Sequence, residues 1–406
     1  MSTVEWSLSN TFPLPYRVIV ISVIGLWAWG SNLQILSWTS INVPLLLSSS
    51  HDKNRTSQTS FKDVYTLASI LTFLIWLNLV IFWKVTGGIE AKITEWTSIP
   101  LACYAVVFVI ILCPFNVLKR KERANFLRCI RRVIFSGFGS EVLPADVIMA
   151  DILTSFAKVF GDLYVTGCIL LFYDVDQEGY SGNRCWSYII APLFTSFPYA
   201  IRFRQCMTEY IRSKYSNRRH LFNAFKYCSA FPVILLSALQ KWYKFESLTH
   251  PSVIWIAPPI LFKLWVISVA FNSMYSFYWD VVMDWKLDFF SPTIPGAFMP
   301  SFKLRTRLPL HFNERVIYYI AIFVNFLLRF TWSLKLSSHL HIIHKLQASV
   351  FLMEIFEVIR RWLWIFFRME SAYVEEKFDK EGGVYDYDPL TINMTEIGGP
   401  LIVDEL

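Results

Sequence analysis

Residues 98–132 read SIPLACYAVVFVIILCPFNVLKRKERANFLRCIRR, an apolar run followed directly by a strongly basic one. The run 98–118 contains no charged residue and has about the length, roughly 20 residues, that crosses the hydrocarbon core of a bilayer. The segment 119–132 carries seven Lys and Arg side chains and one Glu. Because basic loops of membrane proteins face the cytosol, this stretch predicts a membrane-spanning helix followed by a cytosolic loop.

The composition places the whole 406-residue chain in the membrane class. Hydrophobic residues make up 54% and charged residues 17%, whereas ordinary soluble domains have roughly 45–50% and about 25%. These proportions exclude a secreted domain, a nucleic-acid-binding protein and a disordered scaffold. We interpret the net charge of +7 as a consequence of membrane topology and not as the sign of a polyanionic partner.

Nine segments approach or exceed the length needed to span a membrane, so we predict an all-α polytopic membrane protein. Three loops between these segments are basic, and all three fall on one side when the spans are counted in order. This count places the N-terminus in a lumen and the C-terminus in the cytosol. The predicted spans are 16–38, 65–87, 98–118, 146–173, 186–203, 222–242, 252–280, 314–336 and 346–367.

Ionisable residues inside these spans carry the functional signal, because each costs roughly 2.5–3.5 kcal/mol at the centre of a membrane helix. Asp280 and Asp284 are four residues apart, share a helix face and therefore need a counter-charge. Arg329 lies too deep in the eighth span to reach either membrane surface easily. Glu357 and Arg361 form an i, i+4 pair in the ninth span.

Four cations and four carboxylates on five spans are expected to converge, since isolated charges would be costly in the membrane. A pathway whose arginines exchange carboxylate partners for a passing oxyanion would bind the anion without trapping it. Arginine suits this role because its planar fork matches phosphate and its charge is permanent. The eight residues are Arg329, Arg360, Arg361, Lys226, Asp151, Asp280, Asp284 and Glu357.

Other charged residues near the spans have structural interpretations. Lys158 and Asp162 are expected to form an ion pair that fixes helix packing, on the same helical face as Asp151. Glu354 is interpreted as a solvated position or one at the level of the lipid headgroups. For three residues near the cytosolic membrane face a headgroup anchor is an equal alternative to a pathway role: Lys226, Tyr227 and Arg202.

Cysteine and histidine residues do not form a recognisable metal pattern. The seven cysteines lie mainly in or beside apolar runs without CxxC spacing, so we interpret them as buried apolar side chains and predict no disulfide framework. His339, His341 and His344 form a cluster, but no carboxylate or Cys lies nearby to complete a metal site. The sequence predicts neither a metal nor another cofactor.

Three ordered motifs resemble the EXS-domain family, which includes plant and animal phosphate exporters and yeast ER-retention-defective proteins of the Golgi. The motifs follow one another in three successive spans. They are Trp279-Asp280 followed by Met283-Asp284-Trp285, then Leu328-Arg329-Phe330-Thr331-Trp332, then Glu357-Val358-Ile359-Arg360-Arg361-Trp362.

The resemblance implies a phosphate pathway that agrees closely with the residues found from the cost of buried charge. Two departures from the family affect it: Lys286 replaces a glycine after the Met-Asp-Trp element, and Lys158 stands at an apolar position. By this resemblance the pathway is lined by Asp151, Lys226, Tyr227, Asp280, Asp284, Arg329, Trp332, Glu357, Arg360 and Arg361.

The large exporters of the family carry an N-terminal SPX domain and one more leading helix, which this sequence does not show. The chain therefore resembles the short branch, which is associated with the Golgi membrane, with return of lumenal phosphate from glycosylation to the cytosol, and with retention of ER and Golgi proteins. We expect four parts: a three-helix membrane segment (1–118), a basic cytosolic loop (119–145), an EXS-type six-helix transport domain (146–370) and an acidic, disordered cytosolic tail (371–406).

Two other functions compete with transport. An intramembrane enzyme is disfavoured, because Gly161-Asp162 lacks the GxGD element of membrane aspartyl proteases and the Asp280 and Asp284 pair lacks the Gly and Arg of headgroup transferases. A membrane adaptor that recruits sorting machinery through its cytosolic loops stays open. The expected partners are inorganic phosphate and the lipid bilayer, without nucleic acid. No nucleotide-binding motif appears, which favours passive or gradient-driven movement.

Overall fold

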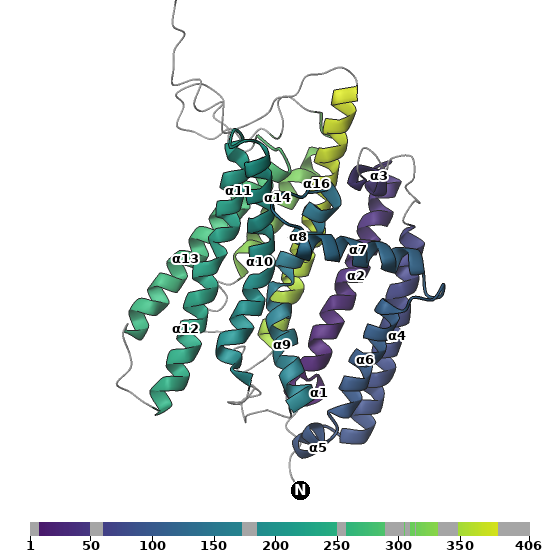
Figure 1. Ribbon diagram of the computed structural model, residues 1–406, viewed down its shortest axis with the longest axis vertical. Coiled ribbons are helices and arrows are strands. Elements are labelled where there is room, and N and C mark those ends of the chain that lie inside the picture. Colours follow the sequence, from purple (N-terminus) through teal and green to yellow (C-terminus); the bar gives the residue numbers. More distant parts are fainter. Residues whose placement is uncertain are drawn as a thin grey trace, which may run out of the picture.

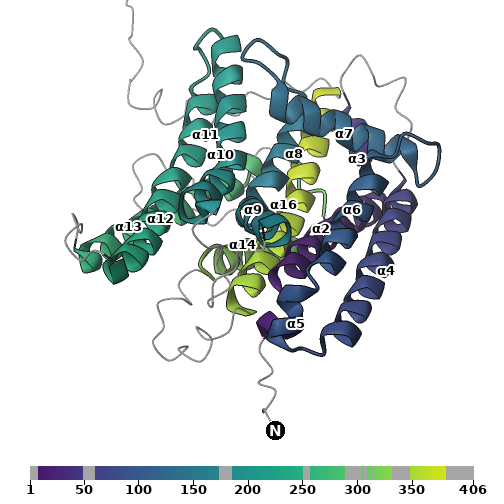
Figure 2. The same ribbon diagram turned by 60° about the horizontal axis from the view of Figure 1, so that its bottom comes forward.

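The computed structural model describes residues 8–48, 60–172, 185–249, 257–288, 304, 309–312, 314–331 and 348–380, and every regular element in these ranges is a helix. In Figures 1 and 2, α2, α4 and α6 form one side of a bundle, α12 and α13 form the opposite edge, and α8, α9, α10, α14 and α16 lie between them. The elements are α1 (Leu8–Thr11), α2 (Leu14–Trp38), α3 (Val43–Leu47), α4 (Phe61–Thr86), α5 (Glu90–Glu95), α6 (Ser98–Leu112), α7 (Arg120–Phe135), α8 (Pro144–Ser155), α9 (Ala157–Phe172), α10 (Ser187–Arg212), α11 (Arg218–Cys228), α12 (Ala230–Thr249), α13 (Pro258–Tyr278), the π-helix η3 (Trp279–Asp284), α14 (Arg315–Arg329) and α16 (Ala348–Lys380).

Within the described residues, four stretches of helix are long and apolar enough to cross a membrane: α2, α4, the α11–α12 pair as far as Tyr243, and α13 with η3. The bent pair α8 and α9 makes a fifth if it counts as one span. The protein is thus a helical membrane protein, whereas the count of nine spans and the orientation stay predictions. α10 and α16 have the length of a span but carry several charged side chains, and α14 has only 15 residues.

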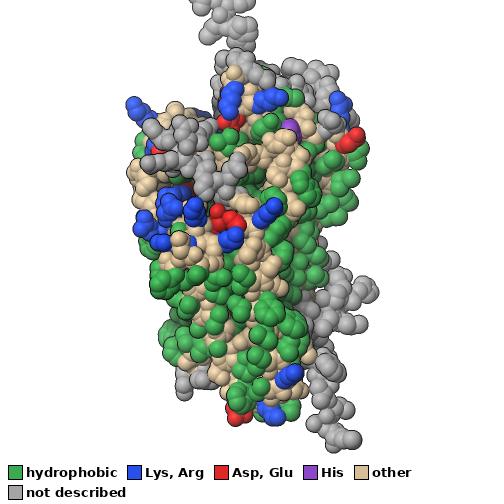
Figure 3. All heavy atoms as spheres, turned by 90° about the vertical axis from the view of Figure 1, so that its right-hand side faces the viewer, with side chains coloured by type: hydrophobic (Ala, Val, Ile, Leu, Met, Phe, Trp, Pro, Cys, Tyr) green, Lys and Arg blue, Asp and Glu red, His purple; other side chains and the backbone are tan. Residues whose placement is uncertain are grey.

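The outer surface carries a broad apolar band, as expected of a helical bundle that faces lipid. On the face that carries α4 and α6, hydrophobic side chains form a broad band, and Lys and Arg side chains gather toward the end where α7 lies (Figure 3). Phe73, Trp76, Phe108 and Val109 are among the exposed apolar residues of these two helices. Large contiguous apolar surface of this kind is rare on soluble monomers.

The predicted fourth span, 146–173, is not one straight helix. α8 and α9 meet at Phe156 and are bent by 63°. Asp151 and Asp162 therefore do not share one helical face, which corrects that prediction. Phe156 packs closely against α2, where a side chain at Gly25 would come within 2.5 Å of the Phe156 ring.

A disulfide joins Cys168 near the end of α9 to Cys185 just before α10, with the two Cα atoms 6.2 Å apart. The prediction that the cysteines form no disulfide is wrong for this pair. The two residues lie 17 positions apart and are brought together only because α9 and α10 pack as an antiparallel hairpin. Close spacing in the sequence, which the cysteine interpretation relied on, gives no sign of such a pair.

Several sequence predictions fall outside the described residues. These include Trp332, the histidine cluster 339–344 and most of the predicted tail. α16 continues through 371–380, the first ten residues of that tail, and 381–406 lie beyond the description.

Candidate functional site

A π-helical turn brings two aspartates side by side. Asp280 and Asp284 belong to η3, whose wider turns keep residues four apart close to one face. Both are buried, Asp280 completely. The counter-charge expected for the pair is Lys226 of α11, whose Nζ lies 3.7 Å from Oδ1 of Asp280 and 3.6 Å from Oδ2 of Asp284. This lysine is itself buried, so it is not a headgroup anchor.

Asp280 is the centre of the cluster, because three cations from three helices surround it. Arg329, the last residue of α14, places Nη2 2.5 Å and Nε 3.2 Å from Oδ2 of Asp280. Nη1 of Arg360 lies 3.5 Å from the same oxygen. A cation at the end of α14 also interacts favourably with the negative end of that helix dipole.

α16 contributes one carboxylate and two adjacent arginines. Nη2 of Arg360 lies 2.8 Å from Oε2 of Glu357, one turn earlier on the same helix. Arg361 points to the bend between α8 and α9, where its Nε donates to Oγ of Ser155 at 3.0 Å and its Nη2 donates to Oγ1 of Thr154 at 3.1 Å. Nη2 of Arg360 also donates to Oγ of Ser155, at 3.3 Å, so the two consecutive arginines share this hydroxyl at the bend.

Asp151 of α8 holds a further group of buried polar side chains. It accepts a hydrogen bond from Nε of Arg202 at 2.9 Å and another from the Tyr227 hydroxyl at 2.5 Å. Arg202 is 2% exposed. The sequence places Arg202 at the end of a span, but α10 continues to Arg212, so Arg202 lies well inside the helix. The site thus includes a buried arginine that the predicted pathway omits.

The cluster has an excess of positive charge and unused hydrogen-bond donors. With Arg202 it contains five cations and four carboxylates within the described residues. Nη1 of Arg360 and Nη1 of Arg361 are buried and have no hydrogen-bond partner among the described residues. A buried guanidinium with free donors is costly unless an acceptor completes it. This arrangement favours an anion with several oxygens.

The structure brings together every predicted pathway residue that it describes. Trp332 is the exception, since it lies outside the described residues. Tyr199 of α10, which the sequence analysis missed, lies close enough to interact electrostatically with Glu357 and Arg360. The nine residues that converge are Asp151, Lys226, Tyr227, Asp280, Asp284, Arg329, Glu357, Arg360 and Arg361.

Two residues given structural interpretations differ in outcome. Lys158 forms the expected ion pair with Asp162. Glu354 is not solvated as expected: its side chain is buried against α9 and α2 and senses the charges of Asp162 and Arg17. Sequence alone cannot separate a lipid-facing from an interior position on a helix as polar as α16.

Lys286 follows η3 in a left-handed conformation, with φ of 52°. This is the backbone geometry that glycine adopts without steric cost, so the position retains the turn for which the family has glycine. The Lys286 side chain is buried, and Nζ lies 2.5 Å from Oε1 of Glu375 in α16. Its charge is therefore paired and does not face the central cluster.

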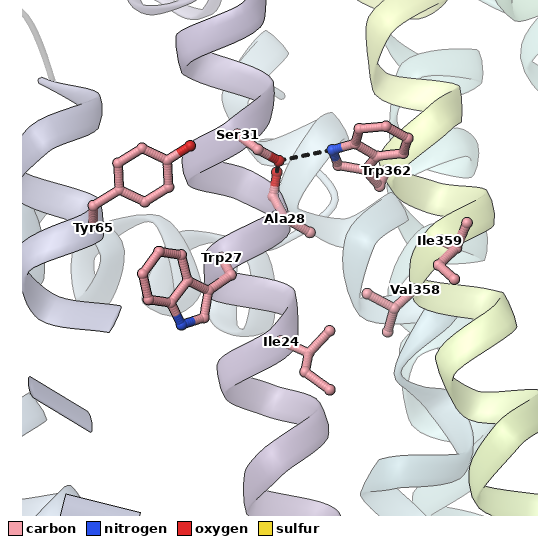
Figure 4. Close-up of a pocket in the computed structure, with 8 residues that line it drawn as sticks. All are labelled: Ile24, Trp27, Ala28, Ser31, Tyr65, Val358, Ile359 and Trp362. Atoms are coloured by element: carbon pink, nitrogen blue, oxygen red, sulfur yellow. Dashed lines mark hydrogen bonds between the residues drawn. The ribbon is translucent and has the colours of Figure 1, made fainter. Parts of the chain in front are cut away.

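A pocket of about 380 Å³ lies between α2, α4 and α16 (Figure 4). Ile24, Trp27 and Val358 give it an apolar lining. Across it, Nε1 of Trp362 donates a hydrogen bond to Oγ of Ser31 at 2.8 Å, which ties α16 to α2. It offers no charged group to a ligand, so we do not assign it to the functional site.

The fold and the cluster together define a class: a helical membrane protein with a charged site buried between its helices. The chain belongs to the EXS family, whose profile matches residues 12–374. Protein ERD1 homolog 2 of Schizosaccharomyces pombe is 28% identical over 91% of this chain and 99% of its own length. Protein ERD1 of Kluyveromyces lactis is 27% identical over 92% and 96%.

The match to a transporter is more partial. Phosphate transporter PHO1-2 of Oryza sativa subsp. japonica is 26% identical over 92% of this chain but only 43% of its own length. The near end-to-end matches to the ERD1 proteins confirm the resemblance to the short branch of the family.

Proposed function

We propose that the charged cluster is a pathway for inorganic phosphate across the membrane. The observation that carries the proposal is Nη1 of Arg361, a buried donor without a hydrogen-bond partner among the described residues, in a cluster with one excess positive charge. Nη1 of Arg360 also makes no hydrogen bond there, although it lies 3.5 Å from Oδ2 of Asp280. Phosphate supplies the oxygen acceptors and the negative charge that would complete these donors. The relative named as a phosphate transporter supports the same substrate.

The ion pairs of the cluster provide a physical route for the anion. Arg329 is bound to Asp280 and Arg360 to Glu357 through charge-assisted hydrogen bonds that a phosphate oxygen could replace one at a time. Each arginine would exchange a carboxylate for the anion and then recover it. The anion is thereby bound at every step, but only some of the cations bind it at any one step, so it is not trapped.

We further propose nine spans, a lumenal N-terminus and passage from the Golgi lumen to the cytosol, which would support glycosylation and the retention of ER and Golgi proteins. The disulfide supports this orientation. Cys168 and Cys185 flank the loop 173–184, which the charge pattern assigns to the lumen, and disulfides persist in oxidising compartments. The relation to the ERD1 proteins supports a Golgi location.

Phosphate efflux from liposomes tests the function. Purified wild type should release radiolabelled phosphate, whereas Arg329→Ala and Arg329→Lys should each lose at least about tenfold in rate, since Lys cannot reproduce the bidentate fork. Arg315→Lys, at the exposed first position of the same helix, is the matched control and should retain the wild-type rate. Thermal melting checks that all variants fold.

The result also separates the proposal from the sorting adaptor. A wild-type protein that is well folded yet releases no phosphate, with a pH gradient or membrane potential imposed, would favour the adaptor. So would a full rate in Arg329→Lys, because an ion pair that only fixes helix packing should tolerate this exchange.

A further inference from the structure

A second group of buried charges lies apart from the central cluster. The group consists of Arg17 in the first turns of α2 (8% exposed), Asp162 of α9 (9%) and Glu354 of α16 (8%). A fourth, more exposed residue, Lys158, forms an ion pair with Asp162. Glu354 precedes Arg360 by six residues, which is roughly 9 Å along a helix axis. The group therefore lies nearer the end of the bundle where α1 is found (Figure 1).

The two carboxyl groups lie close enough to interact electrostatically. The charges of Asp162, Lys158 and Arg17 all act on Glu354. An ionised carboxylate can only accept hydrogen bonds, so a buried carboxyl oxygen that meets no donor is costly in the ionised form. Oε1 of Glu354 is buried and has no hydrogen-bond partner among the described residues. An orphan oxygen of this kind is a place for a proton.

We propose that Asp162 and Glu354 form a proton-binding site at the entrance to the phosphate pathway. The link to phosphate rests on the proposed function, whereas the proton site rests only on the burial of the two carboxyl groups and the unpartnered oxygen of Glu354. Water on the α1 side supplies the proton: hydronium transfers it to Glu354 and becomes water, so no other reactant is needed. The proton then resides on Glu354, near Asp162.

Proton binding changes the charge that an incoming anion meets. With both carboxylates ionised, the group formed by Arg17, Lys158, Asp162 and Glu354 is neutral. With one proton bound, it carries one positive charge. A positive charge at the entrance attracts phosphate, and by reciprocity a bound phosphate favours the protonated pair. Protonation and phosphate entry are therefore linked.

Within the described residues, α6 and the part of α10 that packs along α9 bring no acidic or basic side chain to this group. Tyr104 of α6 donates its hydroxyl hydrogen to the Pro15 carbonyl, and Cys103 is buried beside it. The stretch of α10 that packs along α9, residues 187–201, contains no charged residue. Glu354, which has a buried oxygen without a hydrogen-bond donor, is therefore the group of this set that we expect to gain or lose a proton.

Infrared spectroscopy of the purified protein tests the proton site without any transport. The wild type at acidic pH should show the absorption band of a protonated carboxyl group, and the band should disappear as the pH is raised. Glu354→Gln should lack the band, and Asp162→Asn provides a second variant in case the first folds poorly. Glu376→Gln is the control, since Glu376 pairs with Lys380 at the far end of α16. A band unchanged in both site variants would overturn the proposal.

Efflux at different pH values tests the link to phosphate. Acidification on the α1 side should accelerate wild-type efflux by roughly twentyfold, the effect of one charge about 9 Å away at an effective dielectric constant of about 20. Glu354→Gln should show no such dependence, and Glu376→Gln should behave as wild type. An equal pH dependence in Glu354→Gln would overturn the link. If no variant transports phosphate, the proposed function fails, and the infrared band still decides the proton site.

Discussion

Many residues of the site could be predicted one by one from the sequence, because a charged side chain inside a membrane span is costly and therefore conspicuous. Asp280 and Arg329 stand in apolar runs, and the structure pairs them at 2.5 Å. The same reasoning fails where a residue lies near the end of a run. Arg202 and Glu354 could equally face headgroups, and only the packing of distant helices shows that both are buried.

Lys286 provides a pH prediction at the residue scale, outside the membrane-spanning segments. Burial lowers the pKa of Lys286 to about 8, and the nearby Glu375 only partly opposes this shift. In the unfolded chain the pKa returns to about 10.4. Between these two values the unfolded chain binds a proton that the folded protein has released, so stability should rise with pH across this window.

Lys286→Gly isolates this effect, because it removes the titrating group at a backbone position with φ of 52° that suits glycine. Relative to this variant, the wild type should gain up to about 3 kcal/mol between pH 8 and 10.5 and show no change in the difference below pH 7. Unfolding in detergent, followed at a series of pH values, measures it. Parallel pH curves for the two proteins would contradict the prediction.

At the scale of elements, one arginine of the basic loop fixes two helices. Arg123 of α7 is 3% exposed, although the sequence analysis treats it only as part of the positive charge that sets topology. It donates to four carbonyls at and beyond the end of α6, at 2.6 to 2.8 Å: those of Ile110, Cys113, Val117 and Leu118. The last carbonyls of a helix have no partners within it, so this side chain satisfies groups that would otherwise be unpaired.

Removal of Arg123 should therefore destabilise the protein. We expect Arg123→Ala to lower the free energy of unfolding by about 2–4 kcal/mol, because several partly buried carbonyls lose their donor. Arg120→Ala, an exposed residue of the same helix, should change it by less than about 0.5 kcal/mol. Thermal or denaturant unfolding of both variants decides the matter, and equal effects would show that the loop charge acts only through topology.

The helices themselves were predictable in type, but the bend between α8 and α9 was not. The residues around it, Ser155-Phe156-Ala157, include neither Pro nor Gly, the usual signals of a break. Arg360 and Arg361, more than 200 positions further along the chain, donate hydrogen bonds to the bend. Periodicity within one segment carries no information about such a partner.

For the molecule as a whole, the decisive property is which side of the membrane each loop faces. Charge counting assigns 173–184 to the lumen and 119–132 to the cytosol. The Cys168–Cys185 disulfide beside the first loop agrees with this assignment, since the cytosol keeps thiols reduced. Sequence alone predicted the orientation from charge and missed the covalent bond that supports it.

An engineered glycosylation acceptor tests the orientation directly. Asn-X-Thr inserted within 173–184 should become glycosylated in cells, because only lumenal sites meet the transferase, and the same insert within 119–132 should not. A mobility shift removed by endoglycosidase is the readout, with phosphate efflux confirming that each variant folds. A glycan found on the basic loop alone would show that the orientation in the membrane is the reverse of the predicted one. The carboxyl pair of Asp162 and Glu354 would then face the cytosol, and protonation would favour phosphate entry from that side.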